Sequence, residues 1–377
     1  MAWKEVTEMS ERKEFITLAL GQKRNMSQLC ERFGISRKTG YKWLKRYKED
    51  KKNGLKNQTR RPHSSPVKTH VQTERMILRA REAHPYWGPR KLRAWLMQKK
   101  KSELPSVSTM GAILSRNGSI SEAEREKHQA YIRFEHGEAN ALWQMDFKGN
   151  FPLSQGRCYP LTILDDHSRF SIALEACRHE REEIVEKKLI EVFRKYGMPE
   201  RMTMDNGSPW GSGESCSYLT IWLMRLGIRV SHSRPHHPQT QGKDERFHRT
   251  LKLELLSQKS FDSFEMAQFH FDEWRYVYNT ERPHEALGMQ APISRYRASE
   301  KRYPEVLPAI EYGSDEIVRK VDGYGKISYG NRDWKVGKGF ANQRVAIRAT
   351  ASDGIFHVFF CQQKIKRLDF HLRGVDD

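Results

Sequence analysis

The sequence has no long apolar run, and this shortage excludes several classes of protein. No stretch reaches the roughly 18 apolar residues that a membrane span requires. The first residues, "MAWKEVTEMSERKEF", carry charges where a secretory signal would be apolar. We therefore expect a cytoplasmic protein that is not associated with a membrane.

Cysteine is also scarce and poorly arranged for structural chemistry. The five cysteines are odd in number and scattered, and no two of them form a C-x-x-C pair. They are Cys30, Cys158, Cys177, Cys216 and Cys361. This pattern argues against a disulfide framework and against a thiolate zinc site. We expect reduced cysteines with mainly structural roles.

Acidic residues are outnumbered by basic ones. The chain has 67 Lys and Arg against 47 Asp and Glu, which gives a formal net charge of +20. An excess of this size favours nucleic acid or an anionic membrane surface as the partner. Because the sequence has no span or signal, we expect nucleic acid. The length of 377 residues leaves room for two or three domains, each with its own core.

A helix-turn-helix pattern occupies residues 24–47, within a predicted DNA-binding domain of residues 1–52. Apolar residues at helical spacing precede a Gly-Ile-Ser turn, and a second helix capped by Ser36 follows. Such a second helix enters a DNA major groove. Its outward basic side chains are Arg37, Lys38, Lys42 and Lys45. The alternative is an ordinary helical hairpin, and Gly40 weakens the helix unless it marks close packing.

A basic linker and a second helical domain follow. Residues 53–69 are rich in Pro, Ser, Gly and basic residues and have no period that could form a core. Within this linker, Arg60 and Arg61 would lie along a minor groove or remain solvated. Residues 70–120 predict a second helix-turn-helix domain, whose last helix is capped at Ser108.

The pattern then changes to a mixed α/β core over residues 141–298, after a charged connecting helix at residues 121–140. The runs "LWQMDF", "CYPLTILDDHSRF" and "FSIALEAC" are apolar, β-branched or aromatic and predict three consecutive strands. A helix, the strand "RMTMDNG", a further helix and the strand "IRVSHS" follow. Strands that first meander and then alternate with helices predict a layered α/β fold.

Three carboxylates fall where such a fold gathers side chains. Asp146 ends the first strand, Asp205 ends a later strand, and Glu245 lies in the following helix. Clustered carboxylates repel one another unless cations lie between them, and oxygen ligands favour Mg²⁺. Two such ions roughly 3.5 to 4 Å apart can activate an attacking oxygen and stabilise a leaving oxygen at one phosphate. Glu245 shares a helix face with Arg249 and Lys252, so the acid would hold metal while the bases hold the phosphodiester.

A plainer interpretation of the same residues stays open at this point. Glu245 could form a surface ion pair with Arg249, and the two aspartates could be strand-end caps. On the opposite side of the helix, the residues spaced four apart would face the core in either case. They are Phe247, Leu251 and Leu255.

Longer motifs around the three acids resemble one family. The stretches "WQMDF", "MDNG", "HPQTQGKDERFHRTLKLE" and "YNTERPHEALGMQAP" are similar to the catalytic core of DDE transposases from bacterial insertion sequences, which is itself similar to that of retroviral integrases. The resemblance covers residues 142–292, and the helix-turn-helix pair matches the usual layout of the group. The intervals between the acids are 59 and 40 residues, and the second is longer than the shortest form in the family.

The resemblance implies a ribonuclease H-like core that binds two Mg²⁺ ions, for which Mn²⁺ would substitute. The implied metal ligands are Asp146, Asp205 and Glu245. The implied contacts along a DNA end are Lys243, Arg249 and Lys252. Two neighbouring acids compete with this assignment, but motif alignment favours Glu245 over Asp244, and we expect Asp166 to order the sheet.

Three histidines near the last acid do not predict a zinc site. Pro235 and Pro238 break any helix that would align His232, His236 and His237, and no cysteine is near. We expect these histidines in a loop close to the DNA.

Residues 310–377 predict a small β-barrel. Short alternating segments are divided by Asp-Gly and Gly-Asn pairs, which are the signals of hairpins. Several transposases carry a similar barrel after the core. Because the segment is basic, it could clamp DNA or bridge subunits, or it could only support the core.

These features together predict a transposase that binds the terminal inverted repeats of its own element through residues 1–120. It would cleave a phosphodiester at each end and join the freed 3′-hydroxyl to target DNA without a covalent protein intermediate. Because two ends must meet, we expect a homodimer or larger assembly on double-stranded DNA, associated with the bacterial nucleoid. The alternatives are a catalytically inactive DNA-binding regulator and a nuclease that cleaves without joining.

Overall fold

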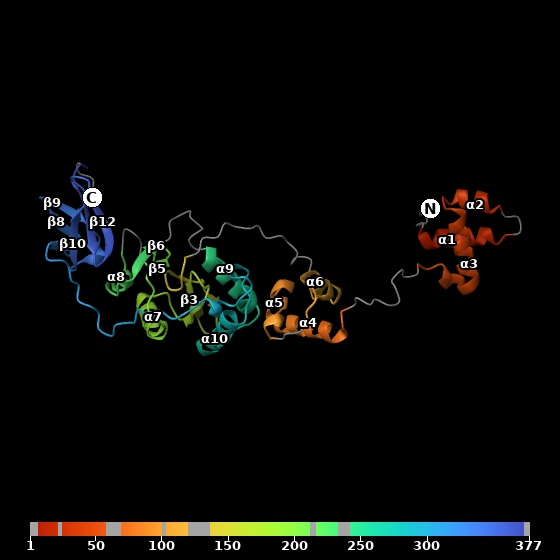
Figure 1. Cartoon of the computed structure of the whole chain (residues 1–377), viewed down its shortest axis with the longest axis horizontal. Helices are drawn as coiled ribbons and strands as arrows, with labels where there is room; N and C mark the ends of the chain where they lie inside the picture. Colours follow the sequence, from red (N-terminus) through yellow and green to blue (C-terminus); the bar gives the residue numbers. More distant parts are fainter. Residues whose placement is uncertain are drawn as a thin grey trace. The chain divides into compact units, whose positions relative to one another are not determined.

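The computed structural model of this protein describes residues 7–21, 25–57, 69–99, 103–119, 136–211, 216–232 and 242–372. The chain divides into two units, Met1–Lys68 and Thr69–Asp377 (Figure 1). Each unit has a hydrophobic core of its own. No helix within these ranges combines the length and the apolar character that crossing a membrane requires. Some predictions lie outside the described residues, namely Arg60, Arg61, His236, His237 and most of the predicted helix at 121–140.

The first unit contains the predicted helix-turn-helix arrangement. Its helices are α1 (Glu8–Ala19), α2 (Met26–Arg32) and α3 (Arg37–Gly54). In the turn, Gly34 adopts a φ of +60°, which glycine tolerates best. The Oγ of Ser36 accepts a hydrogen bond of 3.2 Å from the amide of Thr39, so Ser36 caps α3 as predicted. A Cβ atom on Gly40 would lie 2.6 Å from the sulfur of Cys30, so this glycine marks close packing of α3 on α2.

A second three-helix module begins the larger unit. It consists of α4 (Val71–Ala83), α5 (Pro89–Lys99) and α6 (Val107–Arg116). Its core contains Ile77, Trp87, Leu92, Leu96, Met110 and Ile113. The predicted cap at Ser108 is wrong by two residues. The Oγ of Ser106 reaches the amide of Thr109 at 3.2 Å, so α6 begins after Ser106 and Ser108 lies inside the helix.

A six-stranded mixed sheet forms the centre of the larger unit. Its strands are β1 (Trp143–Phe147), β2 (Phe151–Pro152), β3 (Arg157–Asp165), β4 (Ser171–Cys177), β5 (Arg201–Met204) and β6 (Arg229–His232). The order is β2-β3-β1-β5-β6, and β4 pairs with β3. The first strands pair antiparallel, whereas β1, β5 and β6 run parallel. This order matches the predicted change from a meander to alternating strands and helices.

Helices cover both faces of this sheet. One face packs against α7 (Glu182–Tyr196) and α8 (Tyr218–Arg225), and the other packs against α9 (Gly242–Leu251) and α10 (Phe264–Thr280). Because successive side chains on a strand point to opposite faces, Trp143 and Met145 of β1 enter the cluster with α7 and α8. Gln144 and Asp146 point to the face that α9 covers.

Two small sheets follow the core. The strands β7 (Ile317–Lys320), β10 (Arg344–Ala349), β11 (Ile355–Phe360) and β12 (Gln363–Asp369) pair in the order β12-β11-β10-β7, and β8 (Lys326–Tyr329) pairs with β9 (Arg332–Lys335). Gly330 and Asn331 have φ angles of +61° and +57°, as a two-residue hairpin turn requires. The predicted closed barrel is not confirmed. A barrel needs every edge strand to be paired, and no pairing among the described residues joins β12 to β7 or the hairpin to the sheet.

The carboxy-terminal strands share a core with the central sheet. Val345, Val358 and Phe360 belong to the same hydrophobic cluster as Trp143 of β1. The side chain of Gln363 also pairs with the backbone of Val230, donating to its oxygen at 2.8 Å and accepting from its nitrogen at 2.9 Å. This contact covers the exposed edge of β6, which would otherwise be open to pairing with another chain. Short helices complete the chain at η3 (Lys252–Leu256), η4 (Glu285–Leu287), η5 (Pro292–Ser294) and η6 (Lys338–Phe340).

Candidate active site

Asp146 lies near the end of β1, on the face of the sheet that α9 covers. Its Oδ1 accepts a hydrogen bond of 2.8 Å from the amide of Phe147, and its Oδ2 lies 3.9 Å from Nδ1 of His248. The side chain remains 24% exposed. Burial, followed by the negative charge of Asp205, raises the pKa of Asp146 to about 7. The carboxyl group is therefore held where a positive partner would stabilise its ionised form.

Asp205 directly follows β5, the strand that runs parallel to β1. The carboxyl ends of neighbouring parallel strands meet at one edge of a sheet, which brings Asp205 close enough to Asp146 to raise the pKa of that residue. The exposed Asn206 and Gly207 turn the chain away, and Gly207 has a φ of +107°. His232 of β6 lies beside this turn, with its Nδ1 3.0 Å from the backbone oxygen of Asp205.

Glu245 lies in the first turn of α9, on its exposed side. Arg249 and Lys252 are exposed on the same side, in agreement with their predicted spacing. The opposite side of the helix buries the predicted core residues Phe247, Leu251 and Leu255. Within the described ranges, no group of three or more His, Cys, Asp or Glu side chains is placed to hold a metal ion. The structure therefore brings Asp146 and Asp205 together and leaves Glu245 exposed on α9.

The acid that α9 does bring towards the two aspartates is Asp244. It is only 3% exposed, and its Oδ1 has no hydrogen-bond partner among the described residues. Burial, followed by the charges of Asp146, Asp166 and Asp205, raises the pKa of Asp244 well above its usual range. From the sequence, Asp244 was predicted only as a competitor of Glu245, although helical spacing places it on the same face as the buried Phe247.

His248 and Thr162 also lie at the site, although neither was predicted from the sequence. Nε2 of His248 lies 2.7 Å from Oγ1 of Thr162, and this hydroxyl donates to the backbone oxygen of Asp146 at 2.9 Å. Burial, followed by the charge of Lys148, lowers the pKa of His248 to about 3, so the imidazole is neutral at physiological pH. His248 stands four residues after Asp244, so the helical period could have identified it. Thr162 is placed by strand register, opposite Asp146 in β3.

The cations predicted along DNA occupy two kinds of position. On α3, the four predicted side chains are exposed, and they are Arg37, Lys38, Lys42 and Lys45. On α9, Arg249 and Lys252 are exposed as well. Lys243 differs from all of these, because it turns inwards and forms an ion pair with Asp166.

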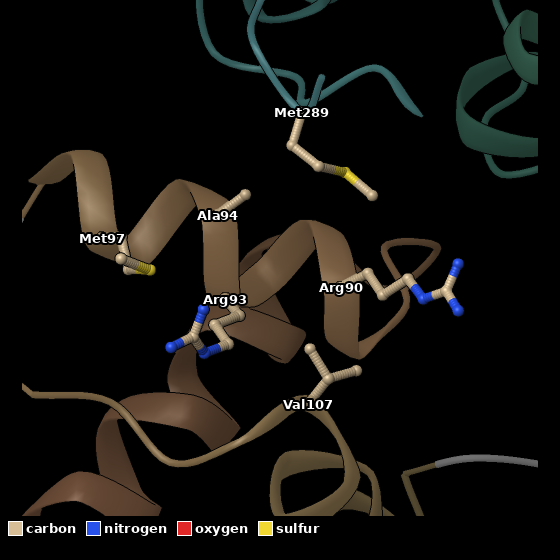
Figure 2. Close-up of a pocket in the computed structure, with 6 residues that line it drawn as sticks. All are labelled: Arg90, Arg93, Ala94, Met97, Val107 and Met289. Atoms are coloured by element: carbon tan, nitrogen blue, oxygen red, sulfur yellow. The ribbon is translucent and has the colours of Figure 1, made fainter. Parts of the chain in front are cut away.

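A pocket of about 340 Å³ lies elsewhere in the larger unit and contains none of these acids. It is lined by Arg90, Arg93, Ala94, Met97, Val107 and Met289. Figure 2 shows the side chain of Met289 reaching towards α5, which carries both arginines. Nε of Arg93 donates to the backbone oxygen of Pro105 at 2.9 Å, so that guanidinium serves the packing of the module.

Domain models of known families match most segments of the chain. An integrase core domain matches residues 136–238, and a second integrase core model matches residues 226–292. The C-terminal domain of IS481 family transposases matches residues 316–376. A homeodomain-like domain matches residues 39–114, and a helix-turn-helix domain matches residues 11–63.

Retroviral polyproteins and integrases are among the similar proteins. The chain is 35% identical over 114 residues to the Gag-Pol polyprotein of feline leukemia virus and 33% identical over 134 residues to the Pol polyprotein of radiation murine leukemia virus (strain Kaplan). These alignments cover 30% and 35% of this chain but only 6% and 22% of the polyproteins.

Solved structures give a more distant likeness. A simian T-cell lymphotropic virus intasome, in complex with the PP2A regulatory subunit B56 gamma, is 16% identical with a TM-score of 0.38, covering 70% of this chain and 91% of the other. The HTLV-2 integrase catalytic core domain in complex with magnesium is 13% identical with a TM-score of 0.33, covering 42% and 97%.

The matched domains agree with the motifs and with the order of the modules along the chain. An integrase core with a ribonuclease H-like fold lies between amino-terminal helix-turn-helix domains and a transposase carboxy-terminal domain. Together, these matched domains are those of a DDE transposase of an insertion sequence.

Proposed function

We propose that this protein binds the terminal inverted repeats of its own element, cleaves a phosphodiester at each end and joins the 3′-hydroxyl to target DNA. The observation that carries the proposal is the adjacency of Asp146 and Asp205 at one edge of the core sheet. Two carboxylates that repel each other in a half-buried site favour a divalent cation. The exposed basic side of α9 offers a place for the DNA backbone next to them.

The donor set fits Mg²⁺ in part, with Mn²⁺ as a substitute. Asp146 and Asp205 would hold the metal with hard oxygen ligands, and Glu245 would complete the set for two ions. When bound, the ions would activate an attacking oxygen and stabilise a leaving oxygen at one phosphate. The fit is incomplete because Glu245 is exposed and because, among the described residues, no group of three or more His, Cys, Asp or Glu side chains is placed to hold a metal ion.

The chain's own residues have positioning roles in this proposal. Arg249 and Lys252 would hold the phosphodiester through charge-assisted hydrogen bonds. The neutral His248, held by its hydrogen bond to Thr162, would line the site beside Asp146 without adding charge. Because the reaction needs only positioning and charge neutralisation, no side chain would form a bond to DNA.

Recognition of the element would belong to the helical modules. The exposed cations of α3 suit a major groove, and the excess of basic residues along the chain suits two DNA partners, the terminal repeats and the target. Because two ends must meet before joining, a homodimer or larger assembly would carry out the reaction on DNA.

The test is an in-vitro reaction with Mg²⁺, labelled fragments of the element's ends and supercoiled plasmid. Wild type should transfer label to the plasmid, whereas Asp146→Ala, Asp205→Ala and Glu245→Ala should bind the fragments without cutting or joining them. Glu183→Ala, which removes an exposed acid from α7, is the matched control and should behave as wild type. Fragments bound by every variant but never cut by wild type would instead indicate a DNA-binding regulator. Cutting without joining would indicate a nuclease.

A further inference from the structure

Lys243 joins the first turn of α9 to the turn after β3. Its Nζ lies 2.5 Å from Oδ1 of Asp166 and 3.3 Å from the backbone oxygen of the same residue. The side chains of Lys243 and Asp166 are only 15% and 3% exposed. The ammonium group of Lys243 therefore forms an ion pair within the protein and is not directed towards a DNA phosphate.

Hydrogen bonds to its carboxylate and from its backbone amide hold Asp166 in place. Its Oδ1 also accepts from Nε2 of Gln144 at 2.9 Å, and its Oδ2 accepts from the amide of His136 at 3.0 Å. Its own amide donates to the backbone oxygen of Leu142 at 2.9 Å. The carboxylate is therefore a rigid acceptor attached to β1 and to the segment before it, and Lys243 connects α9 to that acceptor.

The surroundings of the pair explain why a cation is needed there. The buried Asp244 follows Lys243 directly and feels the charges of Asp146, Asp166 and Asp205, all of the same sign. Lys243 is the cation whose charge opposes them. Without Lys243, the buried Asp244 would lie near the buried carboxylate of Asp166 with no cation to compensate its charge. The repulsion would push the first turn of α9 away from the sheet.

We propose that Lys243 is a positioning residue, whose ion pair with Asp166 holds the first turn of α9, and with it Glu245, at the sheet edge that carries Asp146 and Asp205. The proposal rests on the proposed function for the role of these acids. It replaces the expectation that Lys243 lies along a DNA end. Arg249 and Lys252, which are exposed on α9, keep that role.

The experiment compares four full-length variants with wild type. They are Lys243→Met, Asp166→Asn, the double variant with both changes, and Lys252→Met as the matched control. Single-turnover cleavage at saturating DNA reports on positioning, and the dependence of DNA affinity on salt concentration reports on phosphate contacts. Thermal unfolding confirms that each variant is folded at the assay temperature.

Lys243→Met should cleave on the order of 100-fold more slowly, as expected for a misplacement of about 1 Å, with the salt slope of DNA binding unchanged. Lys252→Met, which removes a proposed phosphate contact, should reduce the salt slope of DNA binding by about 1. The double variant should recover much of the cleavage rate, because it leaves no uncompensated buried charge. A reduced slope in Lys243→Met with a normal rate at saturating DNA would overturn the proposal.

Titration with Mg²⁺ alone separates this proposal from the proposed function and needs no DNA. Lys243→Met and Asp166→Asn should bind Mg²⁺ at least about 10-fold more weakly than wild type, the scale of second-sphere changes at metal sites, and the double variant should lose less. This pattern would support the positioning role even if wild type neither cut nor joined DNA. Equal Mg²⁺ binding in wild type and Lys243→Met would overturn it. If Lys243→Met does not fold, Lys243→Gln takes its place in every measurement.

Discussion

The alternation of side chains along β1 assigns a different task to each residue of the strand. Trp143 and Met145 enter the cluster with α7 and α8, whereas Gln144 and Asp146 face α9. Gln144 donates to Asp166, so Asp146 is the acid of this strand that faces the candidate site. A shift of one residue in register would exchange the two sets. The apolar residues of β1 thus fix the direction in which Asp146 points.

Lys91 is a residue whose burial has a testable consequence for stability. Burial, followed by the charge of Arg282, lowers the pKa of Lys91 to about 8. An unfolded lysine titrates near 10.4, so the folded state releases its proton more easily than the unfolded state. Above about pH 10.4 the lysine is neutral in both states and its burial costs no free energy of unfolding. As the pH falls through about 8, the buried lysine becomes charged and the folded state loses stability.

We predict that Lys91→Met is more stable than wild type at pH 7, by a few degrees in unfolding temperature, since each kcal/mol shifts a medium-sized domain by roughly 2 to 4 °C. The advantage should shrink as the pH rises from about 8 to about 10.4. Differential scanning fluorimetry of both proteins over this range provides the check. Lys364→Met removes an exposed lysine and should change neither the midpoint nor its pH dependence. A Lys91→Met curve parallel to that of wild type would contradict the prediction.

At the scale of elements, a buried ion pair joins the end of the α9–η3 segment to the end of α10. Nε and Nη2 of Arg282 both donate to Glu254, with the closest distance of 2.8 Å, and Nε1 of Trp274 donates to the same carboxylate at 3.2 Å. The two charged side chains are 9% and 10% exposed. A pair buried to this degree contributes little as a whole but costs much when one partner is removed.

Arg282→Met should therefore lower the free energy of unfolding by about 3–5 kcal/mol, because it leaves Glu254 charged and buried. Adding Glu254→Gln should restore most of this loss, since the amide oxygen still accepts from Trp274. Urea unfolding of the single and double variants measures both effects. Arg194→Met breaks an exposed ion pair with Glu305 and should have little effect. Additive losses in the double variant would show that the pair does not act as a unit.

The elements themselves were largely predictable from the sequence, but their side-chain environments were less so. The spacing of Phe247, Leu251 and Leu255 correctly predicted the buried face of α9, because apolar periodicity follows directly from helix geometry. The same period placed Asp244 and His248 on that face, yet motif similarity drew attention to Glu245. Which acid meets the aspartates depends on how α9 rotates against the sheet, and tertiary contacts of this helix, such as the ion pair of Lys243 with Asp166, are not visible in the local sequence pattern. Pairing between distant strands likewise decides whether a barrel closes, and local turn signals do not encode it.

At the scale of the whole molecule, the division into two units separates the most basic helix from the carboxylates. The exposed cations of α3 belong to the first unit, whereas Asp146 and Asp205 belong to the second. The second unit has three hydrophobic clusters that contain no residue of the first. Affinity for DNA and chemistry on DNA should therefore be separable by removing the first unit.

A protein of residues 69–377 should fold by itself, because its clusters remain complete. Each phosphate contact adds about 0.9 to the salt slope of binding to duplex DNA, so loss of the four α3 cations should reduce the slope by up to about 4. The ratio of affinity for the element's ends to affinity for unrelated DNA should also fall, because base contacts by a helix in the major groove carry sequence specificity. Mg²⁺-dependent cleavage of short end fragments should persist at high fragment concentration, because the acids and the basic side of α9 remain. Fluorescence anisotropy at several salt concentrations measures the slope, and a gel assay measures cleavage. An unchanged slope in the shortened protein would locate the main phosphate contacts in the second unit instead.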